Sequence, residues 1–283
     1  MQPVRVTLVR PVGASPGHAV LLPNHVQEVT HDWGIEATWR GMLPDPDAFR
    51  ATLRPRASVI GWDAAVVTGP LAGRPPKLLV MDVDSTLITA EVIDLLAERA
   101  GSGAEVAAIT ERAMHGGLDF ADSLRERVAT LARLPVSVFA DVIAHIDFSP
   151  GARALISAAK ASGARVGVVS GGFVEVVQHL ADTAGIDFAV ANRLEVADGV
   201  LTGRTLGEVI DRPAKLAHTR RFAELAGARL DEVVAVGDGA NDLDMLGAVG
   251  LGVAYRAKPV AAEQADAAIS FPRLDAVRAF AGI

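Results

Sequence analysis

The sequence contains no cysteine, and this absence excludes disulfides and thiolate metal sites. Any metal ion must therefore be held by oxygen or imidazole ligands, and oxygen ligands favour hard cations. Hydrophobic residues make up 50% of the chain, yet no apolar run is long enough to cross a bilayer and no basic-then-apolar signal opens the chain. We therefore expect a cytoplasmic protein with no membrane partner.

Basic residues are also in short supply. The chain has 27 Lys and Arg against 34 Asp and Glu, which gives a formal net charge of -7. This balance disfavours a nucleic-acid partner or an anionic membrane surface, although a local basic pocket is compatible with it. We therefore look for a small anionic substrate. The length of 283 residues suits a large domain that carries a smaller one.

A cluster of glycine and proline between residues 69 and 76 divides two differently patterned stretches of the chain. We place the domain boundary there, with a small N-terminal α/β module over residues 1–72 and a larger domain over residues 73–283. In the module, the apolar pattern predicts strands at about 4–9, 36–40 and 59–67 and helices at about 19–30 and 45–53.

The pattern of the larger domain predicts a doubly wound α/β core. Short apolar runs, typical of strands buried on both faces of a parallel sheet, occur at residues 77–82, 165–170, 187–190, 232–237, 250–254 and 267–270. Helical patterns fill most gaps, and the helix at about 152–162 follows Ser149 and Pro150 as cap and first-turn proline. Residues 90–146 hold several amphipathic helices, which we interpret as an inserted helical cap. Asp198-Gly199 predicts a hairpin turn.

Polar groups stand at the carboxyl ends of these strands, where open α/β sheets bind their ligands. They are Asp82 and Asp84, Ser170 with Gly171 and Gly172, Asp238 with Asn241 and Asp242, and Lys215 on an intervening helix. Converging carboxylates repel one another, and a divalent cation stabilises such a cluster. Oxygen ligands suit Mg²⁺, which commonly bridges carboxylate to phosphate. A phosphate ligand explains the hydroxyl, the glycine N–H groups at a helix start and the lysine, so the set predicts phosphoryl transfer.

In this order, the same residues resemble the four motifs of the haloacid dehalogenase superfamily. Segments 82–87, 169–173 and 237–242 are further similar to the phosphoserine phosphatases, from about Lys77 to the C-terminus. The resemblance implies a Rossmann-like core with a parallel sheet and bound Mg²⁺. It also implies hydrolysis of phosphoserine to serine and phosphate, the last step of serine biosynthesis.

The resemblance also implies the roles of the acids. Asp82 is the nucleophile and a metal ligand, Asp84 gives its backbone carbonyl to the metal and acts as acid and base, and Asp238 is the second side-chain ligand. A neighbouring acid must protonate the serine oxygen and then deprotonate water. An acid at position 84 separates phosphatases and phosphomutases from the dehalogenases and ion-pumping ATPases, which lack one there.

By the same resemblance, the helical cap and the strand ends bind the substrate. The implied binding residues are Glu91 for the ammonium, Arg127 for the carboxylate, Met114 and Phe120 as apolar lining, and Ser170, Gly171, Gly172, Lys215 and Asn241 around the phosphoryl group. Asp242 supports the lysine. An acid and an arginine are what a zwitterionic amino acid requires, because the guanidinium fork binds a carboxylate through two parallel bonds.

The N-terminal module resembles the small ACT-like regulatory domains that precede some phosphoserine phosphatases, and it is the candidate surface for a homodimer. A packing module without a ligand is the alternative. Two other functions stay open. A phosphotransferase that passes the phosphoryl group to another hydroxy amino acid, such as homoserine, would share every motif, and a product assay separates it from a hydrolase. A non-catalytic amino-acid sensor is disfavoured by the intact acids and lysine.

Overall fold

The computed structural model describes residues 1–13, 21–22 and 26–283. Its N-terminal part is a four-stranded sheet with the strand order β2-β3-β1-β4, in which all neighbours are antiparallel. The elements are β1 (Gln2–Pro11), β2 (Gln27–His31), β3 (Gly34–Leu43), α1 (Pro46–Val59) and β4 (Asp63–Val67). Helix α1 begins where Asp45 accepts a hydrogen bond from the backbone N–H of Ala48, and it packs on β4. The label ACT-like stays a prediction.

Two predictions for this module were wrong in part. The helix expected at 19–30 falls partly outside the described residues, and its last residues belong to the strand β2. The strand expected at 59–67 begins only at Asp63, because α1 continues past Pro55 to Val59. Val59 and Ile60 are β-branched and resemble the start of a strand in sequence, whereas the helix is anchored by its buried residues Leu53 and Ala57.

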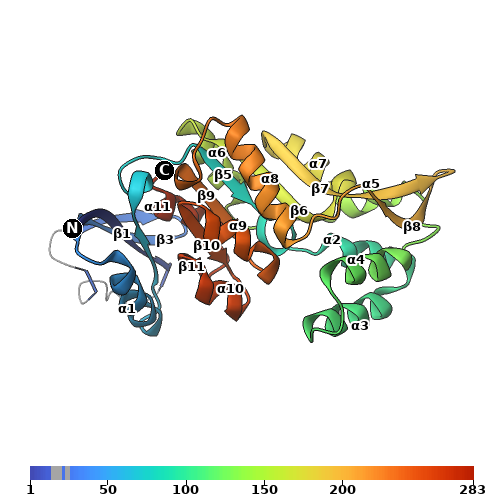
Figure 1. Cartoon of the computed structure of the whole chain (residues 1–283), viewed down its shortest axis with the longest axis horizontal. Helices are drawn as coiled ribbons and strands as arrows, with labels where there is room; N and C mark the ends of the chain where they lie inside the picture. Colours follow the sequence, from blue (N-terminus) through green and yellow to red (C-terminus); the bar gives the residue numbers. More distant parts are fainter. Residues whose placement is uncertain (14–20, 23–25) are drawn as a thin grey trace.

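The larger part of the chain is a seven-stranded sheet with the order β11-β10-β9-β5-β6-β7-β8, as the sequence predicts for a doubly wound core (Figure 1). Its strands are β5 (Leu78–Met81), β6 (Arg165–Phe173), β7 (Phe188–Ala197), β8 (Val200–Leu206), β9 (Val233–Gly237), β10 (Leu251–Tyr255) and β11 (Ala267–Ile269). All neighbours are parallel except β7 and β8, which form the predicted hairpin around Asp198-Gly199.

Helices cover both faces of this sheet. They are α6 (Ala152–Ala161), α7 (Val174–Ala184) and α11 (Val277–Ala281) on one face, and α8 (Arg212–Leu225) and α9 (Leu243–Ala248) on the other. The alternation of β5 shows why: Leu79 and Met81 pack into the first cluster, and Leu78 and Val80 into the second. Successive strand residues face opposite sides, so a strand with helices on both faces is apolar throughout.

The segment between β5 and β6 forms the expected helical insertion. Its helices are α2 (Val92–Ala100), α3 (Gly103–Met114), α4 (Phe120–Ala129) and α5 (Val138–Ile143). Figure 1 shows α3 and α4 at the end of the molecule opposite the N-terminal module. The cap predicted for α6 was wrong: Gly151, with φ of 85°, precedes the helix, and the carbonyl of Ser149 accepts from the N–H of Ala152. A left-handed residue at this position favours glycine.

The two sheets share a hydrophobic core. Val9, Trp33 and Val67 of the N-terminal module belong to the same buried cluster as residues of β11 and α11. Within the part of the chain that the structure describes, no helix combines the length and the apolar character needed to span a bilayer. The position of the domain boundary stays a prediction.

Candidate active site

Asp82 lies at the carboxyl end of β5, next to the end of β9, where the parallel topology brings the predicted motifs together. One of its oxygens, Oδ1, accepts from the N–H of Val83 at 2.7 Å, and Oδ2 lies 2.8 Å from the ammonium of Lys215. Lys215 is fully buried in the first turns of α8, which Asp211 caps by accepting from the N–H of Ala214. The lysine therefore fixes the carboxylate of Asp82 from behind.

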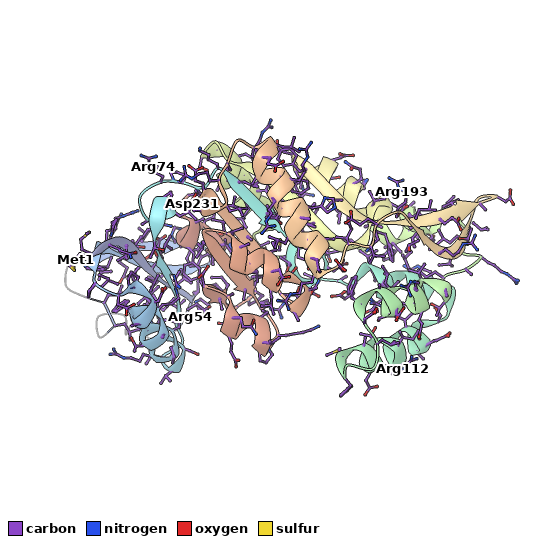
Figure 2. The ribbon with its side chains drawn as sticks, in the orientation of Figure 1. Met1, Arg54, Arg74, Arg112, Arg193 and Asp231 are labelled. Carbon is purple, nitrogen blue, oxygen red and sulfur yellow. The ribbon has the colours of Figure 1, made fainter. Side chains whose placement is uncertain are left out.

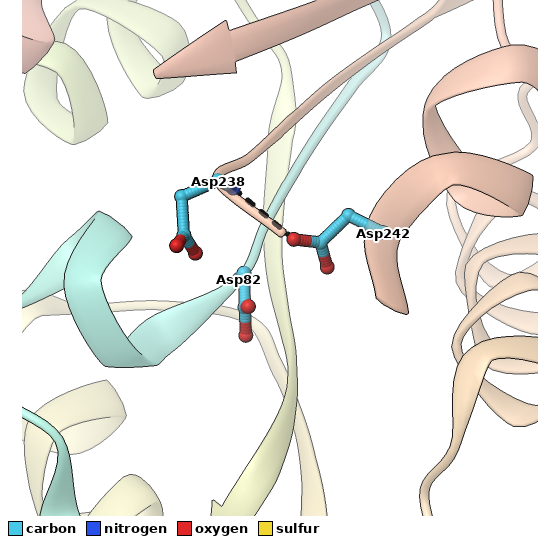
Figure 3. A group of neighbouring side chains, drawn as sticks. All are labelled: Asp82, Asp238 and Asp242. Atoms are coloured by element: carbon cyan, nitrogen blue, oxygen red, sulfur yellow. Dashed lines mark hydrogen bonds between the residues drawn. The ribbon is translucent and has the colours of Figure 1, made fainter. Parts of the chain in front are cut away.

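The carboxylates of Asp238 and Asp242 lie close to that of Asp82, as Figure 3 shows. Oxygens of Asp82, Asp238 and Asp242 lie within 4.8 Å of one another. Both oxygens of Asp242 are engaged, because Oδ1 accepts from Lys215 at 2.7 Å and Oδ2 accepts from the N–H groups of Asp238 and Gly239. Asp82 and Asp238 line the neighbouring cavity, whereas Asp242 does not, so Asp82 and Asp238 are the carboxylates that can offer an oxygen to a cation. This is a donor set that fits a hard divalent ion.

The electrostatics of the cluster also favour a cation. Burial and the neighbouring carboxylate of Asp242 raise the pKa of Asp82 above its ordinary range, while Lys215 opposes the rise. Burial and Asp242 likewise raise the pKa of Asp238 to about 6. Burial lowers the pKa of Lys215, but Asp242 and Asp82 outweigh it and raise the pKa above its ordinary value. One buried lysine among three acids leaves negative charge for a divalent ion to balance.

Asp84 bonds to a different set of groups and lines the cavity described below. Its Oδ1 accepts from the N–H of Val92 at 2.8 Å, and its Oδ2 accepts from the hydroxyl of Ser170 at 3.1 Å. Burial and the nearby charge of Glu91 raise the pKa of Asp84 to about 7. Gly172 must be glycine here, because a Cβ would lie 2.6 Å from Asp84 Oδ2.

The sequence predicts that Gly171 and Gly172 lie at the start of a helix, but the structure places them in a strand. Strand β6 continues through them to Phe173, with an irregular register between Ser170 and Phe173, and α7 begins at Val174. The N–H of Gly172 donates to the hydroxyl of Ser170 at 2.8 Å. The hydroxyl of Ser170, which is fully buried, therefore joins the glycine segment of β6 to Asp84.

A cavity of about 710 Å³ opens above these groups, between the sheet and the cap. The predicted residues that line it are Asp82, Asp84, Glu91, Met114, Phe120, Arg127, Gly171, Gly172, Asp238 and Asn241. Ser170 and Lys215 are buried behind its wall. Phe120 lies against Gly171, where a Cβ would meet its ring at 3.1 Å, whereas Met114 is 67% exposed. Burial lowers the pKa of Arg127, against the raising effect of the carboxylates of Glu91 and Asp94.

The sequence motifs did not indicate three further residues that belong to the site. Ser85 adopts a left-handed φ of 56°, a strained conformation for serine, and its hydroxyl donates to Glu91 Oε1 at 2.7 Å. It thereby orients the acid predicted for the ammonium. Arg212 and Lys258 also line the cavity. The strand-end rule could have indicated Lys258, because it follows β10 just as Asp238 follows β9.

Comparisons with known proteins agree with this geometry. A sequence model of the family described as haloacid dehalogenase-like hydrolase matches residues 79–247. The chain is 52% identical over 221 residues to a phosphoserine phosphatase of Mycobacterium tuberculosis, which covers 78% of this chain and 54% of that protein. It is 53% identical to a phosphoserine phosphatase of Streptococcus thermophilus, over 70% of this chain and 92% of that protein. The chain thus spans about half the length of the mycobacterial relative.

A solved structure gives the same picture in three dimensions. It is described as a phospho-aspartyl intermediate analogue of phosphoserine phosphatase. It superposes with a TM-score of 0.69 and 42% identity, over 73% of this chain and 99% of that one. The similarity in sequence and in fold therefore extends over 73% of this chain.

Proposed function

Because this chain belongs to the haloacid dehalogenase-like hydrolase family, we propose that it hydrolyses O-phospho-L-serine to serine and inorganic phosphate. One observation carries the proposal: a fixed carboxylate, Asp82, lines a cavity that is also lined by an acid, Glu91, and an arginine, Arg127. That combination complements a phosphate, an ammonium and a carboxylate on one small molecule. The names of relatives about half identical to this chain support the same substrate.

The reaction divides into two displacements at phosphorus. In the first, Asp82 Oδ attacks the phosphorus, the bond to the serine oxygen breaks, and Asp84 donates a proton to that oxygen, so serine leaves and an aspartyl-phosphate remains. In the second, Asp84 takes a proton from water, the water oxygen attacks the phosphorus, and the carboxylate of Asp82 leaves with its electron pair. Asp84 is two residues from the nucleophile and lines the same cavity, as both proton transfers require.

The buried groups behind the wall prepare these steps. Lys215 holds Asp82 in place and balances part of the negative charge around it. Asp82, Asp238 and the backbone carbonyl of Asp84 would hold Mg²⁺, whose positive charge would let a dianionic phosphate approach these acids. Asn241, in the turn after Asp238, lies in the cavity wall beside this site. We also propose that the enzyme acts in the cytoplasm and that its reaction is the last step of serine biosynthesis. A homodimer formed through the N-terminal module remains a prediction.

A phosphate-release assay tests the proposal. Phosphoserine should release phosphate in the presence of Mg²⁺, and exhaustive chelation should abolish the release until Mg²⁺ is restored. Asp82→Asn should be folded but inactive, since an amide cannot act as the nucleophile and removes one negative charge from the metal site. Appreciable turnover by this variant would contradict the nucleophile assignment. Phosphohomoserine formed when homoserine is added would indicate transfer instead of hydrolysis.

A further inference from the structure

Two arginines of α1 join the N-terminal module to the C-terminal end of the helix α10 (Pro259–Gln264): Arg50 pairs with Asp266, just beyond the helix, at 3.4 Å, and Arg54 reaches the helix itself. Arg54 donates to the carbonyl of Ala262 at 2.5 Å and to the carbonyl of Ala265 at 2.7 Å. The last carbonyls of a helix lack intrahelical donors, and a cation is favourable at this end of the helix dipole. In Figure 2, Arg54 lies where the module faces the core. This side chain therefore fixes the C-terminal end of α10.

The opposite end of α10 belongs to the active-site cavity. Lys258, the residue just before the helix, and Val260 in its first turn both line the cavity. The backbone N–H of Lys258 also donates to the carbonyl of Asp238 at 3.0 Å. A displacement of α10 would therefore move Lys258 relative to the cavity and would disturb the segment that carries Asp238.

Among the charged residues that line the cavity, Lys258 is a cation available to bind a phosphate. The lining carboxylates are Asp82, Asp84, Glu91, Asp94 and Asp238, and the lining cations are Arg127, Arg212 and Lys258. Arg212 is bound to Asp244 at 2.5 Å. Lys258 is an exposed residue whose ammonium has no hydrogen-bond or ion-pair partner among the residues described, and its charge acts on the nearby carboxylate of Asp238. A phosphate dianion that enters past the acids therefore meets an unpaired cation at Lys258.

We propose that Lys258 binds the phosphate of the substrate at the rim of the cavity, and that Arg54 is a positioning residue that places Lys258 through α10. The inference rests on the proposed function, because it takes a phosphomonoester as the ligand. It assigns to the N-terminal module a part in substrate binding, although the predicted motif residues all lie outside the module.

Binding to the inactive Asp82→Asn variant in the presence of Mg²⁺ tests Lys258 directly. By calorimetry, Lys258→Gln should weaken phosphoserine and inorganic phosphate alike, by roughly fivefold at low salt, as for a partly exposed charge pair. Arg220→Gln, which removes an exposed charge on α8 outside the cavity, is the control and should change neither affinity. Unchanged phosphate affinity in Lys258→Gln would overturn the proposal. If phosphoserine itself is not the substrate, inorganic phosphate still decides the role of Lys258.

A double-mutant cycle tests Arg54. Arg54→Gln should weaken phosphate binding two- to threefold, as a fraction of the roughly fivefold effect of Lys258, and should have no further effect in the Lys258→Gln background. Thr52→Ala on the same helix is the control, because within the described residues that hydroxyl bonds to carbonyls of its own helix. Equal losses in both backgrounds would show that Arg54 does not act through Lys258. If Arg54→Gln does not fold, Arg54→Lys, which keeps the charge but only one compact donor group, is measured in the same cycle.

Amine labelling gives a readout that is independent of affinity. The chain has four lysines, Lys77, Lys160, Lys215 and Lys258, and Lys215 is fully buried. In the Asp82→Asn variant, saturating phosphoserine should slow acetylation of Lys258 several-fold and leave Lys77 and Lys160 unchanged. Equal acetylation of Lys258 with and without ligand would contradict direct contact.

Discussion

At the scale of single residues, some side chains of the site bond to other protein groups and others are left to contact a ligand. Lys215 and the N–H of Val83 occupy the two oxygens of Asp82 from the protein side. Arg127, by contrast, makes one backbone bond at 3.3 Å, from Nε to the carbonyl of Ser123, so the rest of its guanidinium can meet a ligand. Its half-buried position in the cavity wall should make an ion pair there stronger than one in open water.

Arg127→Ala should therefore impair binding more than chemistry. Loss of a charged hydrogen-bond partner typically costs about 1.5–3 kcal/mol, or roughly 10- to 100-fold in affinity. We expect KM for phosphoserine to rise by that factor, while kcat/KM for a phosphomonoester without a carboxylate stays near the wild-type value. Arg125→Ala, two residues away and paired with Asp122 in solvent, is the control and should leave both constants unchanged. Equal losses on the two substrates would mean that Arg127 organises the cap instead.

At the scale of elements, one helix supports the nucleophile and another supplies side chains for substrate binding. Helix α8 carries Lys215 to the back of the nucleophile, and α4 carries Phe120 and Arg127 to the cavity. Each begins with an aspartate that accepts from a backbone N–H in its first turn. The caps fix where each helix starts, and therefore how far its functional side chain reaches.

Substitution of the two caps should have different kinetic consequences. Asp211→Ala in α8 and Asp119→Ala in α4 should each destabilise the protein by about 1 kcal/mol, which denaturant unfolding measures. Asp211→Ala should lower kcat, because Lys215 loses its fixed place. Asp119→Ala should mainly raise KM. If both variants altered the same kinetic constant, the division of labour between the two helices would be wrong.

At the scale of the whole molecule, both apolar and polar contacts hold the N-terminal module on the core. Trp33 is 2% exposed and stacks near Phe271, with ring centroids 6.2 Å apart. Arg5, buried in β1, donates to the carbonyl of Phe280 at 2.5 Å. Such contacts couple the module to the strand edge next to α10.

Trp33→Ala should consequently destabilise the whole chain. Truncation of a buried tryptophan typically costs roughly 3–5 kcal/mol. We expect one cooperative unfolding transition, shifted to lower denaturant, when circular dichroism and enzymatic activity are followed together. Val59→Ala at the exposed end of α1 is the control and should leave the midpoint near its wild-type value. Two separate transitions would show that the module unfolds independently of the core.

A carboxylate at this junction should make stability depend on pH. Burial raises the pKa of Asp63 to about 6, although the N–H and hydroxyl of Ser270 donate to it. The pKa of an aspartate in an unfolded chain is about 3.9. Between this pKa and that of folded Asp63, the folded chain therefore binds more protons than the unfolded chain. The contribution of Asp63 to stability should therefore fall as pH rises from about 4 to about 6 and stay constant above. The difference in unfolding free energy between wild type and Asp63→Asn should follow this curve; a rise over the same window would contradict the pKa direction.

The sequence by itself determined the core, the insertion and most residues of the candidate site. The continuous apolar runs fixed the strands, because a strand covered on both faces has no polar side, and parallel topology then brought Asp82, Ser170 and Asp238 to one edge. The match of four motifs in order indicated the family. These signals are local or depend only on strand order, so a single sequence can carry them.

Only the tertiary structure decided the contacts between distant segments. The bond from Ser170 to Asp84 and the bond from Lys215 to Asp242 join residues far apart in the chain. The same holds for the extent of α1 and for the contact of Arg54 with α10, since burial against another element overrides local propensity there. No spacing within the sequence encodes such pairs, because each is set by how two independently formed surfaces pack.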